Sequence, residues 1–191
     1  KAKDVVIVGG GPSVKEHEVG INEYLKFNKQ MPIIHASSKN ARSFDRLSNC
    51  QYYCLAGSEG LRLEKIFAHE LNPQNKCVLP PFPRKMGTYI PEIIRNSAYE
   101  LEAIDFTSNI QDTHTAIALQ TAIQLGATTI YLLGYDGYLN GIADKKEMEL
   151  LLENSKLFSL VQQLKGIKLV SLTSTYYEGI TRKSIYGIQI K

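Results

Sequence analysis

Two segments of the chain hold residue types that could bind and process a phosphorylated ligand. The first is a turn that follows the apolar run 4–8 and has the sequence Gly9-Gly10-Gly11-Pro12-Ser13. Glycines let a backbone approach an anion closely, and the free amides at the start of a helix attract negative charge. We therefore expect this turn to hold a phosphate, with Ser13 adding a hydroxyl donor. The alternative is a tight turn without a ligand.

The second segment surrounds a helix start and a later strand end. Its candidate ligand contacts are Asn109, Gln111, Thr113 and Gly134. His114 could act as a general base or contact a phosphate, because the imidazole pKa lies near neutrality. Asp136 could bind Mg²⁺ on a phosphate, accept hydrogen bonds from a sugar or assist the reaction. The structural alternatives are an Asp-Gly turn at Asp136 and an N-cap at Asp112.

Polar residues also follow two other predicted strands. Ser37, Ser38 and Asn40 come after the run 32–36 and could contact a ribose or sugar, although helix capping would explain them equally well. Tyr176-Tyr177 lies beyond the last predicted strand. Because parallel strands end at the same edge of a sheet, all these groups could face one cleft.

Alternating elements must position these residues. Apolar, β-branched runs predict strands at 4–8, 32–36, 51–56, 76–79, 129–133 and 167–172. Helical spacing and stop signals predict helices at 13–29, 40–47, 61–71, 112–125 and 145–164. The segment at about 80–108 is an irregular excursion with its own short helix and strand. The pattern predicts a single Rossmann-like α/β domain over 1–191, doubly wound, with a mostly parallel sheet and helices on both faces.

The glycine turn and the block 113–138, which includes LGATTIYLLGYDGY, resemble those of one protein group. It comprises MptE-like 6-hydroxymethylpterin diphosphokinases, motility accessory factors and some bacterial sialyltransferases. The two blocks cover under a quarter of the chain. The resemblance implies a phosphate or nucleotide at the first turn and Asp136 near the same cleft. The resemblance does not decide whether the protein transfers a diphosphate, transfers a sialyl group or does neither.

Several classes of function are disfavoured. Val14 stands where the dinucleotide fingerprint has its third glycine, and no carboxylate ends the run 32–36, so we expect no NAD. The net charge of +3 is spread along the chain, and no 18-residue apolar run occurs. These features predict a cytoplasmic protein that binds neither nucleic acid nor membrane. Cys50, Cys54 and Cys77 are expected to be buried free thiols.

Two functional hypotheses follow. The first is a glycosyl- or diphosphotransferase that binds a nucleotide, nucleotide-sugar or other phosphorylated small molecule, with Mg²⁺ as the candidate cofactor. The second is a non-catalytic ligand-binding or assembly domain attached to a larger enzyme. The chain starts at Lys1 without a methionine, which suggests a fragment with an upstream domain. A faint resemblance to domains that follow aldolase-type barrels of bacterial carbohydrate metabolism would make the parent protein a lyase.

Overall fold

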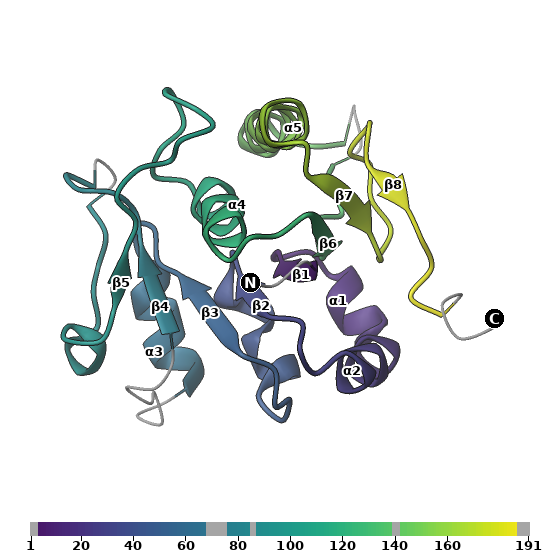
Figure 1. Ribbon diagram of the computed structural model, residues 1–191, viewed down its shortest axis with the longest axis horizontal. Coiled ribbons are helices and arrows are strands. Elements are labelled where there is room, and N and C mark those ends of the chain that lie inside the picture. The colour runs from purple at the N-terminus through teal and green to yellow at the C-terminus, as the bar shows by residue number, and fades with distance from the viewer. Residues whose placement is uncertain (1–3, 68–75, 85–86, 139–141, 187–191) are drawn as a thin grey trace.

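The computed structural model describes residues 4–67, 76–84, 87–138 and 142–186. They form one eight-stranded parallel sheet in the order β5-β4-β3-β2-β1-β6-β7-β8 (Figure 1). The strands are β1 (Asp4–Val8), β2 (Ile33–His35), β3 (Gln51–Cys54), β4 (Lys76–Leu79), β5 (Tyr99–Glu100), β6 (Thr129–Leu133), β7 (Lys168–Ser171) and β8 (Thr181–Arg182). The predicted Rossmann-like α/β class is confirmed.

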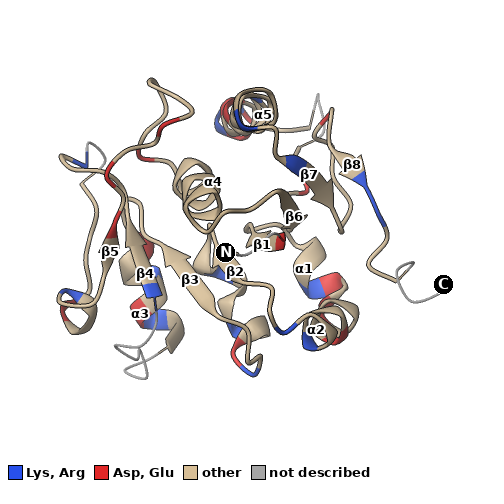
Figure 2. Ribbon diagram, in the orientation of Figure 1, with Lys and Arg blue, Asp and Glu red and all other residues tan. Residues whose placement is uncertain are grey.

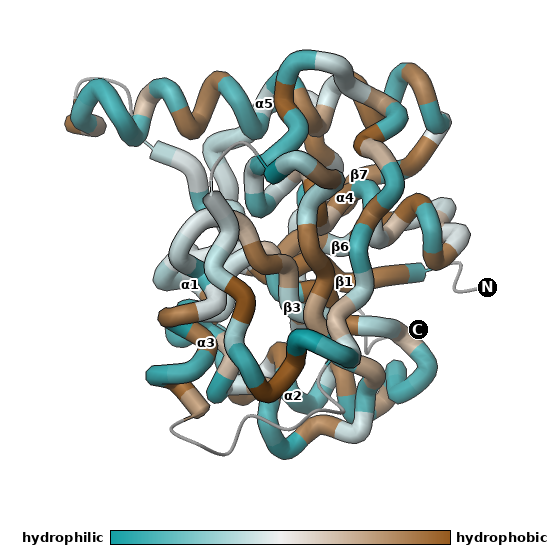
Figure 3. The backbone as a smooth tube through the Cα atoms, turned by 90° about the vertical axis from the view of Figure 1, so that its left-hand side faces the viewer, coloured by the Kyte–Doolittle hydropathy of each residue, from teal (hydrophilic) through white to brown (hydrophobic). Residues whose placement is uncertain are grey.

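β1 lies at the centre of the sheet because both of its faces are apolar. Val5 and Ile7 pack on one side, Val6 and Val8 pack on the other, and all four are fully buried. A strand covered on both faces by helices is typical of parallel sheets. Figure 3 shows the resulting hydrophobic centre in brown along β1, β6 and β7.

Helices cover the two faces of the sheet. α1 (Ser13–Glu16), α2 (Glu18–Phe27), the 3₁₀ helix η1 (Ser38–Phe44) and α3 (Glu59–Phe67) lie on one face, and α4 (His114–Gln124) and α5 (Lys145–Lys165) lie on the other (Figure 1). Lys, Arg, Asp and Glu are interspersed along most of these helices (Figure 2). In the described part of the chain, no helix is long and apolar enough to cross a membrane.

The predicted helix 13–29 is wrong in one respect, since it is two helices. His17 joins α1 to α2 with φ −110° and ψ 18°, outside the α-helical range. The predicted polar helix 40–47 is the 3₁₀ helix η1, which begins at Ser38. The helix predicted at 61–71 begins at Glu59, and residues 68–71 lie outside the described residues.

The segment 80–108 holds a short 3₁₀ helix, η2 (Glu92–Ile94), and the edge strand β5, as predicted. β8 was not predicted, because two exposed residues leave no apolar pattern. Cys54 and Cys77 are buried, but Cys50 is exposed, which corrects the expectation for that thiol. Cys50 lies just before β3, so its side chain does not join the buried part of that strand.

The direction of winding reverses next to β1. From β1 the chain adds β2, β3, β4 and β5 on one side, and it then returns through α4 to place β6 on the other side of β1. Such a reversal leaves a crevice beyond the carboxyl ends of the two strands. The first turns of α5 project past this edge of the sheet (Figure 3).

Candidate functional site at the switch point

The glycine turn after β1 is locked against the turn after β6. Gly9 N–H donates to Leu133 O and Gly11 N–H donates to Gly134 O, both at 2.8 Å. A Cβ at Gly9 would lie 2.6 Å from Gly134 O, and a Cβ at Gly11 would lie 2.6 Å from Asp136 Cγ. The close approach of these two turns therefore requires glycine at both positions.

Asp136 holds this junction together. Its Oδ2 accepts from Ser13 N–H at 3.0 Å, and its Oδ1 accepts a short hydrogen bond from Ser13 Oγ. The carboxylate thus supplies the negative charge at the start of α1 from within the protein. Both Asp136 oxygens therefore already have a partner in Ser13, and Mg²⁺ binding at Asp136 stays a prediction. Across the described residues, no group of three or more His, Cys, Asp or Glu side chains could hold a metal ion.

A pocket of about 530 Å³ opens at the carboxyl ends of β1 and β6. We call it the switch-point pocket. Its walls come from the turn 9–12, the segment after β2, the first turns of α4 and α5, the turn 134–138, and the side chains of Arg62 and Tyr177. Its size lies within the range of pockets that hold small molecules.

A buried carboxylate supports one wall of the switch-point pocket. Glu59 begins α3 and is 3% exposed. Its Oε1 accepts from Ser38 N–H at 2.7 Å and from Ser38 Oγ at 2.5 Å. Its Oε2 lies 3.1 Å from Arg62 Nη1 and 3.3 Å from His114 Nε2. One carboxylate therefore joins the segment after β2, the start of α3 and the start of α4.

These contacts decide the charge state of Glu59. Burial by itself would raise the pKa of this carboxyl group, because it disfavours the charged form. The close contact with His114 and the hydrogen bonds from Ser38 outweigh burial and lower the pKa of this carboxyl group to about 2. Glu59 is therefore ionised at neutral pH and gives His114 and Arg62 a fixed anionic partner.

Several predicted site residues do line the switch-point pocket. They are Gly9, Gly10, Gly11, Pro12, Ser37, His114, Gly134 and Asp136. They come from four separate segments of the chain, which the ends of β1, β2 and β6 and the start of α4 bring together. Tyr177 also lies in this wall, whereas Tyr176 is absent from it.

Three other predicted contacts have structural partners instead. Ser13 binds Asp136, and Ser38 binds Glu59. Asn40 is buried, and its Nδ2 donates to Gly9 O at 3.1 Å and Gly11 O at 3.2 Å. These side chains support the glycine turn and its neighbouring segments from within the protein and do not line the pocket.

The predicted contacts before α4 lie outside the pocket lining. Thr113 is the N-cap of α4, and its hydroxyl accepts from Ala116 N–H at 3.2 Å, so the cap expected at Asp112 falls one residue later. Gln111 Nε2 donates to Ile104 O at 3.4 Å and to Thr107 O. Asn109 is exposed and accepts from Ser108 Oγ at 3.2 Å.

Several polar side chains at this site were not predicted from the sequence, among them Lys39, Glu59, Arg62, Glu147 and Asn154. Asn154 is 5% exposed and donates from Nδ2 to Tyr177 Oη at 3.0 Å. Its Oδ1 has no hydrogen-bond partner within the described residues. Asn154 sits in the middle of a 21-residue helix, where no turn or strand end points to a site.

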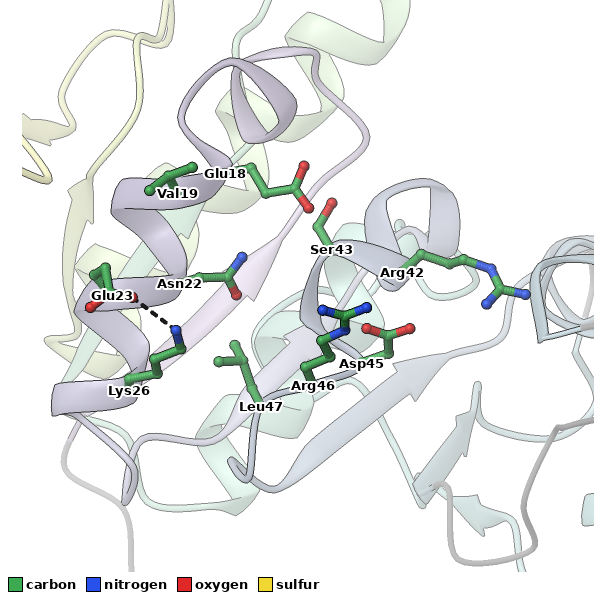
Figure 4. Close-up of a pocket in the computed structure, with 10 residues that line it drawn as sticks. All are labelled: Glu18, Val19, Asn22, Glu23, Lys26, Arg42, Ser43, Asp45, Arg46 and Leu47. Carbon is green, nitrogen blue, oxygen red and sulfur yellow. Dashed lines mark hydrogen bonds and ion pairs between the residues drawn. The ribbon is translucent and has the colours of Figure 1, made fainter.

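A second hollow, of about 440 Å³, lies between α2 and η1 (Figure 4). Side chains of both charge signs line it, including Glu23 and Lys26, which form an ion pair at 2.8 Å. None of its lining residues lines the switch-point pocket, and it contains no predicted site residue. The switch-point pocket is therefore the better candidate site.

No family model and no curated protein matches the chain. Two solved structures are similar. A point mutant of the alpha-2,3/8-sialyltransferase CstII has a TM-score of 0.60 at 17% identity, covering 99% of this chain and 90% of the other. The sialyltransferase CstII from Campylobacter jejuni, in complex with the substrate analogue CMP-3FNeuAc, has a TM-score of 0.53 at 15% identity, covering 95% of this chain and 88% of the other. The chain thus has a sialyltransferase-like fold.

Proposed function

We propose that the switch-point pocket binds a CMP-sugar and that the protein transfers the sugar to a hydroxyl acceptor. The observation that carries this proposal is the fold similarity to a sialyltransferase over 99% of the chain. It is supported by a pocket of about 530 Å³ at the position where doubly wound sheets bind ligands. The second similar structure holds a CMP-sugar analogue.

In this proposal the glycine turn and the segment after β2 form the nucleotide side of the pocket. Asp136 keeps the turn in place through Ser13 rather than taking part in the reaction. Diphosphate transfer is the less favoured chemistry, because Asp136 is the one carboxylate predicted to bind Mg²⁺, and it also serves as the hydrogen-bond partner of Ser13. Positioning and charge would then supply most of the catalysis.

His114 is the proposed proton acceptor. Its Nε2 faces the buried Glu59 carboxylate at 3.3 Å, which leaves Nδ1 as the nitrogen that can accept a proton. The acceptor hydroxyl would form a bond to the anomeric carbon and lose its proton to Nδ1. The bond from that carbon to the nucleotide phosphate would break, and CMP would leave with the bonding electrons.

The proposal can be tested by thermal unfolding with CMP, UDP, AMP and NAD, followed by a transfer assay that measures CMP release from CMP-N-acetylneuraminate. CMP should raise the melting temperature by several degrees at about a hundred times its Kd. His114→Asn should keep this shift and lower CMP release by about a hundredfold or more. His17→Asn, outside the pocket, is the matched control.

The outcomes separate the two functional hypotheses. A shift with CMP together with CMP release supports the transferase. A shift with CMP but no CMP release from CMP-N-acetylneuraminate supports the ligand-binding module and contradicts the transferase. No shift with CMP or with a CMP-sugar refutes the proposal.

A further inference from the structure

The middle glycine of the turn lies beside side chains rather than backbone. A Cβ at Gly10 would have Ser37 Oγ at 3.4 Å and Lys39 Cδ at 3.6 Å as its nearest neighbours. Gly9 and Gly11 instead meet the turn after β6 at 2.6 Å. Gly10 is partly exposed and lines the switch-point pocket. The turn is therefore closed on one side, and on its open side it faces Ser37 and Lys39.

A second cation reaches the same place from α3. Arg62 Nη1 lies 3.4 Å from Ser37 Oγ and 3.1 Å from Glu59 Oε2, and its side chain is 50% exposed. Lys39 is exposed and forms no ion pair within the part of the chain that the structure describes. Ser37, Lys39 and Arg62 thus form a donor group around Gly10.

The carboxylates near the pocket already have partners within the protein. Asp136 and Glu147 line the pocket, and Glu59 Oε2 lies 3.1 Å from Arg62 Nη1. Asp136 accepts from Ser13, and Glu147 Oε2 accepts from Asp144 N–H at 3.0 Å as part of the helix cap of α5. Among the charged side chains near Gly10, Lys39 is therefore the one without an ion-pair partner in the described part of the chain, and Arg62 shares its carboxylate with other donors.

From the open side of Gly10 and the donors beside it we infer that the anionic group of the ligand lies over Gly10 and is bound by Lys39 and Arg62, with Ser37 as a further donor. The inference rests on the proposed function, because it names the part of that site that holds the charge. Arginine and lysine pair with phosphate or carboxylate through charge-assisted hydrogen bonds. The ion pair with Glu59 orients the Arg62 guanidinium group in the absence of ligand.

A CMP-sugar of the sialic acid type carries two anionic groups, the nucleotide phosphate and the sugar carboxylate. The test separates them by calorimetric titration with cytidine, CMP and CMP-3FNeuAc. The proteins are the wild type, Lys39→Gln and Arg62→Gln. Lys29→Gln is the matched control, because Lys29 is also exposed but precedes β2 and so lies at the opposite edge of the sheet.

Each of the two variants should weaken binding of the anionic ligand by roughly tenfold and leave cytidine binding unchanged. If a variant loses the extra affinity that the wild type has for CMP over cytidine, the phosphate lies over Gly10. If it loses the extra affinity for CMP-3FNeuAc over CMP, the carboxylate lies there. Lys29→Gln should match the wild type in every titration.

If both variants bind all three ligands as the wild type does, the inference is overturned while the proposed function stands. If CMP and CMP-3FNeuAc fail to bind the wild type, the proposed function fails, and the inference fails with it. A loss of cytidine binding equal to the loss of CMP binding would also overturn the inference, since it would indicate a general change in the pocket.

Discussion

Replacing Glu59 by Gln should destabilise the protein strongly and in a pH-dependent way. Glu59 is 3% exposed, and its partners lower the pKa of its carboxyl group from 4.5 to about 2. A shift of this size corresponds to about 3 kcal/mol of stability at pH 7. Because the folded-state pKa is the lower one, this stability is fully present above pH 4.5 and is lost as the pH falls toward 2. Gln keeps an oxygen for Ser38 but turns an NH₂ group toward Arg62 and His114.

The measurement is urea unfolding of the wild type and Glu59→Gln at several pH values. We expect a difference of about 3 kcal/mol in the free energy of unfolding at pH 7, of which about 2 kcal/mol disappears between pH 5 and pH 3. Glu64→Gln, on the same helix but partly exposed, should change stability by less than about 0.5 kcal/mol. A Glu59→Gln effect no larger than that of Glu64→Gln, or one that stays constant down to pH 3, would refute this account of Glu59.

Three further predictions concern other parts of the chain. Gly11→Ala should lower the free energy of unfolding by about 1–3 kcal/mol, because the new Cβ would meet the Asp136 carboxylate at 2.6 Å. Gly10→Ala should lower it less, and equal losses for the two variants in urea unfolding would contradict this. Burial lowers the pKa of His35 to about 4, so protonation of the unfolded state should remove about 2 kcal/mol of stability between pH 7 and pH 5. His35→Leu should abolish that loss. If the free energy of unfolding of His35→Leu depends on pH as strongly as that of the wild type, His35 is not its cause. Cys50 should react with iodoacetamide in the native protein while the other two thiols react only after unfolding, as mass spectrometry would show.

Most of the fold could be predicted because its signals are local. The β-branched run 4–8 ends at glycines, and the helix of small residues at α4 ends at a glycine before the next apolar run. Each of these signals depends only on residues that are close together in the sequence. The break at His17 could not be predicted, because the pattern on both sides of it is helical and the apolar spacing continues.

The site was predicted less completely, because a polar residue type does not reveal which way it points. Ser37 and Ser38 are adjacent, yet Ser37 lines the pocket and Ser38 is buried against Glu59. Glu59 itself has the sequence context of an ordinary surface residue in the first turn of a helix. Its role depends on His114, which is far away in the sequence and arrives beside it only when α4 crosses the sheet.

The order of the strands also has a consequence for synthesis of the protein. β1 pairs with β6 through registers such as Asp4 with Thr129, so the central strand lacks one neighbour until the later half of the chain has left the ribosome. At bacterial and eukaryotic elongation rates this takes on the order of ten seconds. During that time β1 is an unprotected apolar edge, which is the kind of surface on which chains aggregate. A nascent chain that stalls before β6 should therefore be the species that most needs a chaperone.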